Sequence, residues 1–162
     1  MLDAFNSAAA DELRTSLRAC CAADAWIEAI IAGRPYADEA RLAAVSDAAT
    51  AALDDTGLGE ALAGHPRIGD RGHGWSRQEQ SGMAGASADV QTELAAANAD
   101  YERRFGHVYL VCATGRSATE LLAICRARLG NDPDDERAVV LGELAKINRL
   151  RLEKLLHPEA AR

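Results

Sequence analysis

The sequence of 162 residues predicts an all-α fold, a single-domain helical bundle that spans residues 1–162. Apolar residues recur at steps of three and four along most of the chain, which is the spacing of a helix face. Aromatic residues make up only 4% of the chain, and alanine and leucine supply most of its apolar bulk, which favours helix over strand. The alternation of apolar and polar residues that marks a half-buried strand is nearly absent. The length suits one compact domain with one core.

Two helices are predicted in the first third of the chain, over residues 11–31 and 38–53. The first is expected to break near Asp24 and to end at the Gly-Arg-Pro sequence that begins at Gly33, because glycine and proline terminate helices. A short turn over residues 58–63 is expected after the second helix. The second helix is expected to bury one stripe of apolar residues, namely Leu42, Val45 and Ala49.

Three features predict the longer helices of the second half. Residues 88–105 place their apolar side chains on one helical face. Ser117 and Glu120 have the spacing of a capping box at the start of the next helix. Asp132 and Pro133 then have the residue types of an N-cap and a first helical position, so they begin the last helix. The apolar face of the first of these helices comprises Val90, Leu94, Ala97, Tyr101 and Phe105.

The charge and the cysteines narrow the class of protein. A net charge of −7 argues against a broad surface for nucleic acid or for an anionic membrane. The four cysteines form no CxxC pair, so we expect buried thiols in a reducing compartment. No segment resembles a signal peptide, and no apolar run approaches the ~20 residues that span a bilayer. We therefore expect a soluble, cytoplasmic protein that contacts neither nucleic acid nor membrane.

The segment from His65 to Gln80, which reads HPRIGDRGHGWSRQEQ, departs from the helical pattern. It combines glycines with acid–base side chains, and such loops carry the chemistry of many helical scaffolds. His65 precedes a proline, which restricts its backbone and the direction in which its side chain leaves the chain. Because histidine exchanges protons near neutral pH, His65 is a candidate acid–base residue. An ordinary histidine in a loop between two helices is the alternative.

Ser76, Glu79 and Gln80 admit two readings. A serine followed three residues later by glutamate is a capping box, which would explain the pair without any function. The N-terminus of a helix also offers N–H groups and a positive dipole to a carboxylate ligand. Both interpretations stay open at this point.

The sequence contains no pattern typical of a metal site, a phosphate-binding loop or a catalytic nucleophile. His73 lies eight positions after His65, but no metal-binding spacing of histidine, cysteine or acidic residues accompanies the two, so we expect no metal. The glycines match neither common phosphate-binding pattern. No sequence typical of an activated serine or cysteine nucleophile is present. An enzyme of this sequence would therefore work by acid–base chemistry and by orienting its substrate.

Several arginines could bind a substrate carboxylate with two hydrogen bonds, although most arginines simply face solvent. A short apolar run at residues 108–113, VYLVCA, is too brief for a helix and is expected to be extended or to begin another element. The candidate arginines are Arg67, Arg71, Arg103, Arg104 and Arg116.

Several motifs together resemble those of the 2-oxo-4-hydroxy-4-carboxy-5-ureidoimidazoline (OHCU) decarboxylase family. They stand in the family's order: HPRIGD at 65–70, SRQEQ at 76–80, NADYERRFG at 98–106 and VYLVCATGR at 108–116. The run DERAVVLGELAKINRLRLEKLL at 135–156 resembles the family's last helix. The resemblance covers most of the chain.

The resemblance implies a cofactor-free, all-helical enzyme that forms homodimers. Members remove CO2 from OHCU and deliver (S)-allantoin late in urate breakdown. By their positions in the motifs, His65 resembles the family's catalytic histidine, and Glu79 a second catalytic residue that contacts the substrate. The residues that resemble substrate-binding positions are Pro66, Ser76, Gln80, Tyr109, Leu110, Val111, Cys112, Ala113 and Arg116. The stretch from Tyr109 to Ala113 resembles one that meets the ligand largely through its backbone.

Three other functions are compatible with the sequence. A non-catalytic module that binds ureides or purine-like ligands would keep the pocket and release no CO2. An interaction protein would use residues 65–80 only as a connector. A hydrolase of a related ureide would open a ring or release ammonia instead of forming allantoin.

Overall fold

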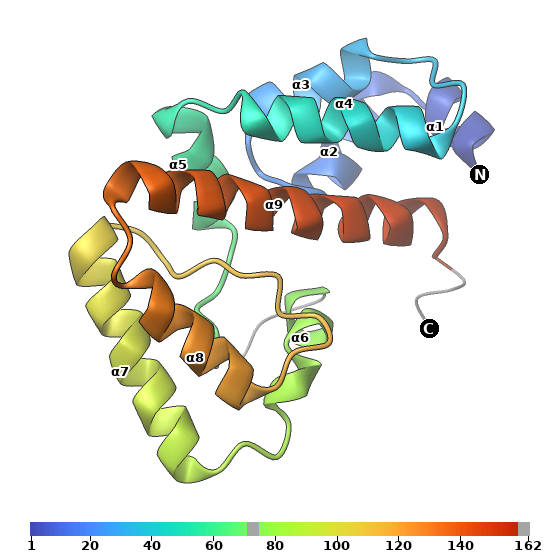
Figure 1. The fold of residues 1–162 in the computed structure, drawn as a ribbon. Helices are drawn as coiled ribbons and strands as arrows, with labels where there is room; N and C mark the ends of the chain where they lie inside the picture. The colour runs from blue at the N-terminus through green and yellow to red at the C-terminus, as the bar shows by residue number, and fades with distance from the viewer. Residues whose placement is uncertain (71–74, 159–162) are drawn as a thin grey trace. The chain divides into compact units, whose positions relative to one another are not determined.

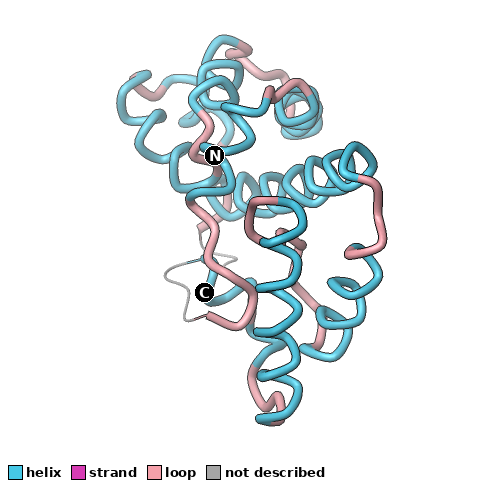
Figure 2. Tube along the Cα trace, turned by 90° about the vertical axis from the view of Figure 1, so that its left-hand side faces the viewer, coloured by secondary structure: helices cyan, strands magenta, loops and turns pink. Residues whose placement is uncertain are grey.

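The structure is a computed structural model, which describes residues 1–70 and 75–158, except for the side chains of residues 75 and 76. Its described residues form helices joined by turns and loops, without a strand among them (Figure 2). The predicted all-α class is confirmed. Within the described part of the chain, no helix is both long and apolar enough to cross a bilayer.

The chain divides into two compact units. One comprises residues 1–64 together with the chain from Leu144 onward, and the other comprises residues 65–143. Helix α9, which covers Pro133–Leu156, supplies residues to both units (Figure 1).

The first unit contains five helices before the loop that begins at His65. The predicted helix over residues 11–31 is two helices, separated at residues 21–23. Helix α1 has only six residues and carries no long periodic pattern, which is why the sequence did not reveal it. The five helices are α1 (Leu2–Ser7), α2 (Ala10–Cys20), α3 (Asp24–Ala32), α4 (Glu39–Ala51) and α5 (Asp55–Ala63).

Helix α4 corrects one prediction about the core. Leu42 is buried as expected, but the other buried positions of α4 are Ser46 and Thr50, not Val45 and Ala49. Both hydroxyl groups are buried because they have partners. Trp26 donates its indole N–H to Ser46 Oγ at 3.2 Å, and Asn148 donates to Thr50 Oγ1 at 3.1 Å.

The second unit contains two of the three predicted longer helices and the first part of the third, α9. Ser117 and Glu120 form the predicted capping box, in which each side chain accepts a hydrogen bond from the other's backbone N–H. Asp132 accepts a hydrogen bond from the N–H of Asp134 at 3.0 Å, as expected at the start of α9. The helices of this unit before α9 are α6 (Trp75–Glu79), the 3₁₀ helix η1 (Ser81–Met83), α7 (Ala88–Phe105) and α8 (Ala118–Arg128).

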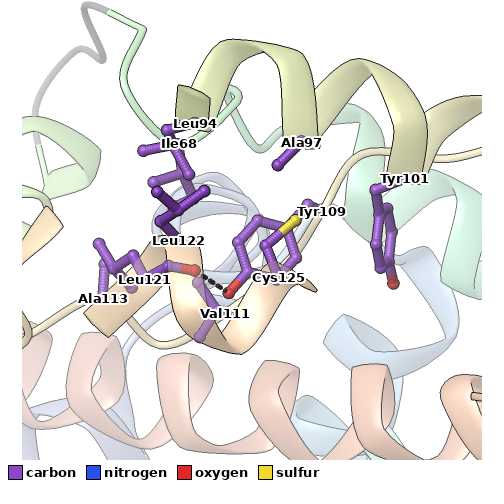
Figure 3. Close-up of a cluster of buried hydrophobic side chains, with 10 residues drawn as sticks. All are labelled: Ile68, Leu94, Ala97, Tyr101, Tyr109, Val111, Ala113, Leu121, Leu122 and Cys125. Carbon is purple, nitrogen blue, oxygen red and sulfur yellow. Dashed lines mark hydrogen bonds between the residues drawn. The ribbon is translucent and has the colours of Figure 1, made fainter. Parts of the chain in front are cut away.

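One apolar cluster organises the second unit (Figure 3). Helices α7 and α8 pack together, and the cluster also includes Ile68 from the loop and side chains from residues 109–113. Tyr109 is fully buried and donates its hydroxyl hydrogen to the carbonyl of Leu121 at 3.0 Å. Burial raises the pKa of the Tyr109 hydroxyl, so this side chain is a neutral part of the core. The cluster therefore joins several of the segments that carry the family motifs.

Candidate functional site

The loop that begins at His65 is anchored to α7. His65 and Pro66 are half-buried, whereas Ile68 is buried in the apolar cluster. Arg67 forms two hydrogen bonds with the carboxylate of Glu102, one of them 2.7 Å long. The hydrogen bonds from Arg67 hold the pKa of Glu102 below its usual value. This pair fixes the loop two residues after the candidate acid–base histidine.

A second set of contacts holds the same loop through its backbone. Gln80 Oε1 accepts a hydrogen bond from the N–H of Gly69 at 2.8 Å, and Gln80 Nε2 donates to the carbonyl of Arg67 at 3.3 Å. Asn98 Nδ2 donates to the carbonyl of Ile68 at 2.8 Å. Gly69 has φ of +98°, a conformation that L-residues with a Cβ rarely adopt. The structure therefore assigns Gln80 a clear role, which is to hold the segment that follows His65.

Glu79, next to Gln80, is the last residue of α6, and only 8% of its surface is exposed. A buried carboxylate is rare unless it is paired, and Glu79 does take part in a polar interaction. The capping-box interpretation of Ser76 and Glu79 is wrong. Helix α6 already begins at Trp75, so Ser76 lies within the helix and Glu79 lies at its end. The Ser76 side chain itself lies outside the described residues.

A backbone contact brings η1 against the turn that follows residues 109–113. A Cβ built on Gly82 would lie 1.9 Å from the carbonyl oxygen of Arg116, so only glycine allows this approach. Arg116 is half-buried, and its Nε donates to the carbonyl of Cys112 at 3.1 Å. Gln80 and Gly82 thus connect the loop after His65 with the turn at Arg116.

Side chains from α8 and α9 contact the backbone of the predicted ligand-binding segment. Tyr109, Leu110, Val111 and Ala113 are buried, and Cys112 is half-buried. Arg128 donates to the carbonyl of Leu110 at 2.7 Å. Glu143 accepts a hydrogen bond from the N–H of Cys112 at 2.8 Å.

Several functional candidates are not brought to this region. Arg103 pairs with Asp100 on the same helix, and Arg104 donates to the carbonyl of Asn131 at 2.8 Å. Arg71 and His73 lie outside the described residues. No group of three histidine, cysteine or acidic side chains suited to a metal occurs among the residues that the structure describes.

A cavity of about 490 Å³ lies between the loop and α7. Its walls include Ile68, Gly69, Met83, Leu94 and Asn98. Neither His65 nor Glu79 is among its described lining residues, so this hollow does not coincide with the predicted catalytic pair.

Sequence reasoning missed four residues that shape this region. Their roles depend on contacts with residues distant in the chain, although the motif NADYERRFG already contained two of them. The missed residues are Gly82, Asn98, Glu102 and Glu143.

Known proteins share both the sequence and the fold. The chain is 26% identical over 152 residues to the uric acid degradation bifunctional protein TTL of Arabidopsis thaliana, a match that covers 88% of this chain and 47% of that protein. It is 29% identical over 136 residues to a 2-oxo-4-hydroxy-4-carboxy-5-ureidoimidazoline decarboxylase of Amia calva, covering 79% of this chain and 78% of that one. The chain thus spans about half the length of the Arabidopsis relative.

A solved structure of an OHCU decarboxylase has a similar fold. The crystal structure of OHCU decarboxylase in the presence of (S)-allantoin superposes with a TM-score of 0.77 at 28% identity, and the match covers 85% of this chain and 94% of that chain. The family model of OHCU decarboxylase matches residues 6–153, which is nearly the whole sequence. The chain therefore belongs to the OHCU decarboxylase family.

Proposed function

We propose that this chain decarboxylates OHCU to (S)-allantoin and CO2 without a cofactor, as a carboxy-lyase of urate degradation. The observation that carries the proposal is the connection of the motif segments within one unit. Gln80 holds the loop that follows His65, and Gly82 packs against the turn that follows residues 109–113. The solved relative described with (S)-allantoin supports the ligand class.

The substrate supplies its own acceptor for electrons. When the bond from the ring carbon to its carboxylate breaks, a neighbouring ring C=N group takes up the electron pair and CO2 leaves. The electron shift leaves a C=C bond between this carbon and the ring carbon that carries the ureido group, and the ring nitrogen takes up a proton. The ureido-bearing carbon then receives a proton while the hydroxyl group loses one to become the ring carbonyl. Delivery of that proton to one face produces one enantiomer. The protein must therefore hold the carboxylate out of the ring plane and control the movement of protons.

We assign the proton transfer to His65. The proline that follows it and the Arg67–Glu102 pair restrict the loop on which it stands. Glu79, which is buried beside Gln80, orients His65 or accepts hydrogen bonds from the ureido N–H groups. Both roles require the carboxylate of Glu79.

The remaining predicted contacts bind the substrate. The backbone of residues 109–113 donates hydrogen bonds to the substrate ring and accepts hydrogen bonds from it. This role suits a segment whose side chains, such as that of Val111, are buried in the core. Arg116 is a weaker candidate, because its Nε already donates to the carbonyl of Cys112. The other proposed contacts are Pro66, Ser76, Gln80, Tyr109, Leu110, Cys112 and Ala113.

Three further properties belong to the same proposal. Residues 1–162 constitute one domain, because the family model crosses the boundary between the two compact units. The chain assembles as a homodimer and acts in the cytoplasm. Size-exclusion chromatography with light scattering tests the dimer, and fractionation of cells tests the location.

The test generates the unstable substrate in place from urate, with urate oxidase and 5-hydroxyisourate hydrolase. Ultraviolet absorbance follows the loss of OHCU, and circular dichroism reports the handedness of the allantoin. We expect faster loss of OHCU with CO2 release and formation of the (S) enantiomer. Binding of (S)-allantoin without faster turnover would instead support a non-catalytic ureide-binding module, and ammonia or an opened ring would indicate a hydrolase.

A further inference from the structure

Three side chains hold the backbone of residues 110–112 by hydrogen bonds. Arg128 binds the Leu110 carbonyl, and Glu143 binds the Cys112 N–H. Arg116 binds the Cys112 carbonyl. Val111 lies between these contacts, and among the described residues neither its N–H nor its carbonyl makes a hydrogen bond.

Arg128 is itself fixed by a buried network. Only 6% of its surface is exposed, and its guanidinium contacts the Glu136 carboxylate at 2.6 Å. Glu136 is fully buried and also accepts hydrogen bonds from Tyr101 and from Asn131. The guanidinium lies 5.0 Å from the centre of the Tyr109 ring, within the range of a cation–π contact. Because every group in the network has a partner, Arg128 has little freedom to move.

A structural role alone would not require these charges at the backbone of an irregular segment. Burying a charged group costs free energy even when it is paired, and apolar residues would fill the same volume. What Arg128 and Glu143 provide is directional hydrogen bonding to two backbone groups that flank Val111.

We propose that Arg128 and Glu143 are positioning residues, which hold the carbonyl of Leu110 and the N–H of Cys112 so that the backbone of Val111 binds the ligand. This inference rests on the proposed function, because it concerns the same substrate segment. Neither residue contacts the substrate or transfers a proton. Their effect therefore falls on binding and not on the proton-transfer step.

The test compares two substitutions of Glu143 that differ in one property. Glu143→Gln keeps an oxygen acceptor for the Cys112 N–H, whereas Glu143→Met keeps the length of the side chain and removes the acceptor. We expect Glu143→Met to raise the Kd for (S)-allantoin and the KM for OHCU by about tenfold, with kcat and its pH profile little changed, as for loss of uniform binding. Glu143→Gln should stay within about twofold of the wild type.

Nuclear magnetic resonance supplies a direct readout. In the wild type, (S)-allantoin should shift the Val111 amide signal, and the Cys112 amide should exchange slowly with solvent. Glu143→Met should lose both properties, and Glu143→Gln should keep them. Arg128→Lys, which keeps the charge but cannot reproduce the forked contacts, should also weaken allantoin binding. If Glu143→Met does not fold, the allantoin affinity of Arg128→Lys tests the positioning role instead.

A matched control is Arg126→Met. Arg126 lies on α8, as Arg128 does, but its partner is the exposed Glu93. Arg126→Met should therefore leave Kd, KM and kcat unchanged. Wild-type allantoin affinity in folded Glu143→Met, or equal losses in Glu143→Met and Glu143→Gln, would overturn the positioning role. If the wild type decarboxylated no OHCU, the proposed function would fail. Selective loss of allantoin affinity in Glu143→Met would still support the positioning role.

Discussion

Gln80 accepts a hydrogen bond from the backbone N–H of Gly69 at 2.8 Å, across eleven residues of the chain. The same side chain donates to the carbonyl of Arg67 at 3.3 Å. One amide group therefore holds two backbone groups of the loop that follows His65, the N–H of Gly69 and the carbonyl of Arg67. This geometry requires a side chain that both accepts and donates, which glutamine provides.

Replacing Gln80 tests this relationship. Gln80→Leu removes both hydrogen bonds, and we expect kcat/KM to fall about tenfold because the loop no longer holds its productive geometry. Gln80→Glu keeps the acceptor for Gly69 and should lose less activity. Hydrogen exchange at the Gly69 amide, measured beside the kinetics, should speed up in Gln80→Leu. Equal kcat/KM of the wild type and Gln80→Leu would show that the Gln80 hydrogen bonds do not contribute to activity.

His65→Asn should lower kcat by at least a factor of about 10², the low end of what general acid–base catalysis contributes. Its circular dichroism spectrum should match that of the wild type. His157→Asn is the control, because His157 pairs with Glu39 in the other compact unit. Near-normal turnover of His65→Asn would remove this histidine from the mechanism.

Glu79→Gln should lower kcat and raise KM together, by about tenfold in kcat/KM, because it removes the charge and keeps the shape. Steady-state kinetics with substrate made in place measures both constants. Glu120→Gln provides a comparison, since Glu120 only caps α8 at an exposed position. That variant should lose some thermal stability and keep its kinetic constants. An effect of Glu79→Gln on melting temperature alone would assign Glu79 a structural role.

Gly82→Ala should destabilise the protein by about 1–3 kcal/mol or more, because the added Cβ would lie 1.9 Å from the Arg116 carbonyl oxygen. Denaturant unfolding measures the loss. Gly142→Ala is the matched control, since a Cβ at this exposed position of α9 meets no atom within 4 Å. Alanine favours a helix over glycine by about 1 kcal/mol, so this variant should be slightly more stable than the wild type. Equal stability of Gly82→Ala and the wild type would contradict the close approach.

The cysteines should differ in their reaction with iodoacetamide. Cys112 is half-buried and should react first in the folded protein, whereas Cys20, Cys21 and Cys125 should react only after unfolding. Burial raises the pKa of Cys125 to about 11 and also raises that of Cys21, which keeps both thiols in the unreactive protonated form. Mass spectrometry of peptides after timed labelling distinguishes the sites. (S)-Allantoin should slow the labelling of Cys112, and early labelling of Cys125 would contradict its burial.

The same shifts have a consequence for stability. In the unfolded chain a thiol ionises near pH 8.5, well before Cys125 ionises in the fold. The protonated Cys125 thiol therefore makes its full contribution to the free energy of unfolding below about pH 8.5. This contribution declines as the pH rises toward 11. Denaturant unfolding between these pH values should show the decline, and Cys125→Ala should reduce it.

Local signals in the sequence determined the all-α class, the length of α7 and the capped start of α8. Helix periodicity and the Ser117–Glu120 box depend on residues three or four apart, so the sequence alone contains them. The motifs also indicated the family and pointed to His65 and Glu79 as candidates. Their predicted catalytic roles await the kinetic experiments.

Only the tertiary structure decided which side chains hold the site in place. Ser46 and Thr50 are buried because Trp26 and Asn148 reach them from positions 20 and 98 residues away. The same is true of the Arg67–Glu102 pair and of Glu143 at the Cys112 N–H, whose partners lie 35 and 31 residues apart. Periodicity reports which face of a helix is apolar, but a hydrogen bond between distant residues exists only after the chain has folded.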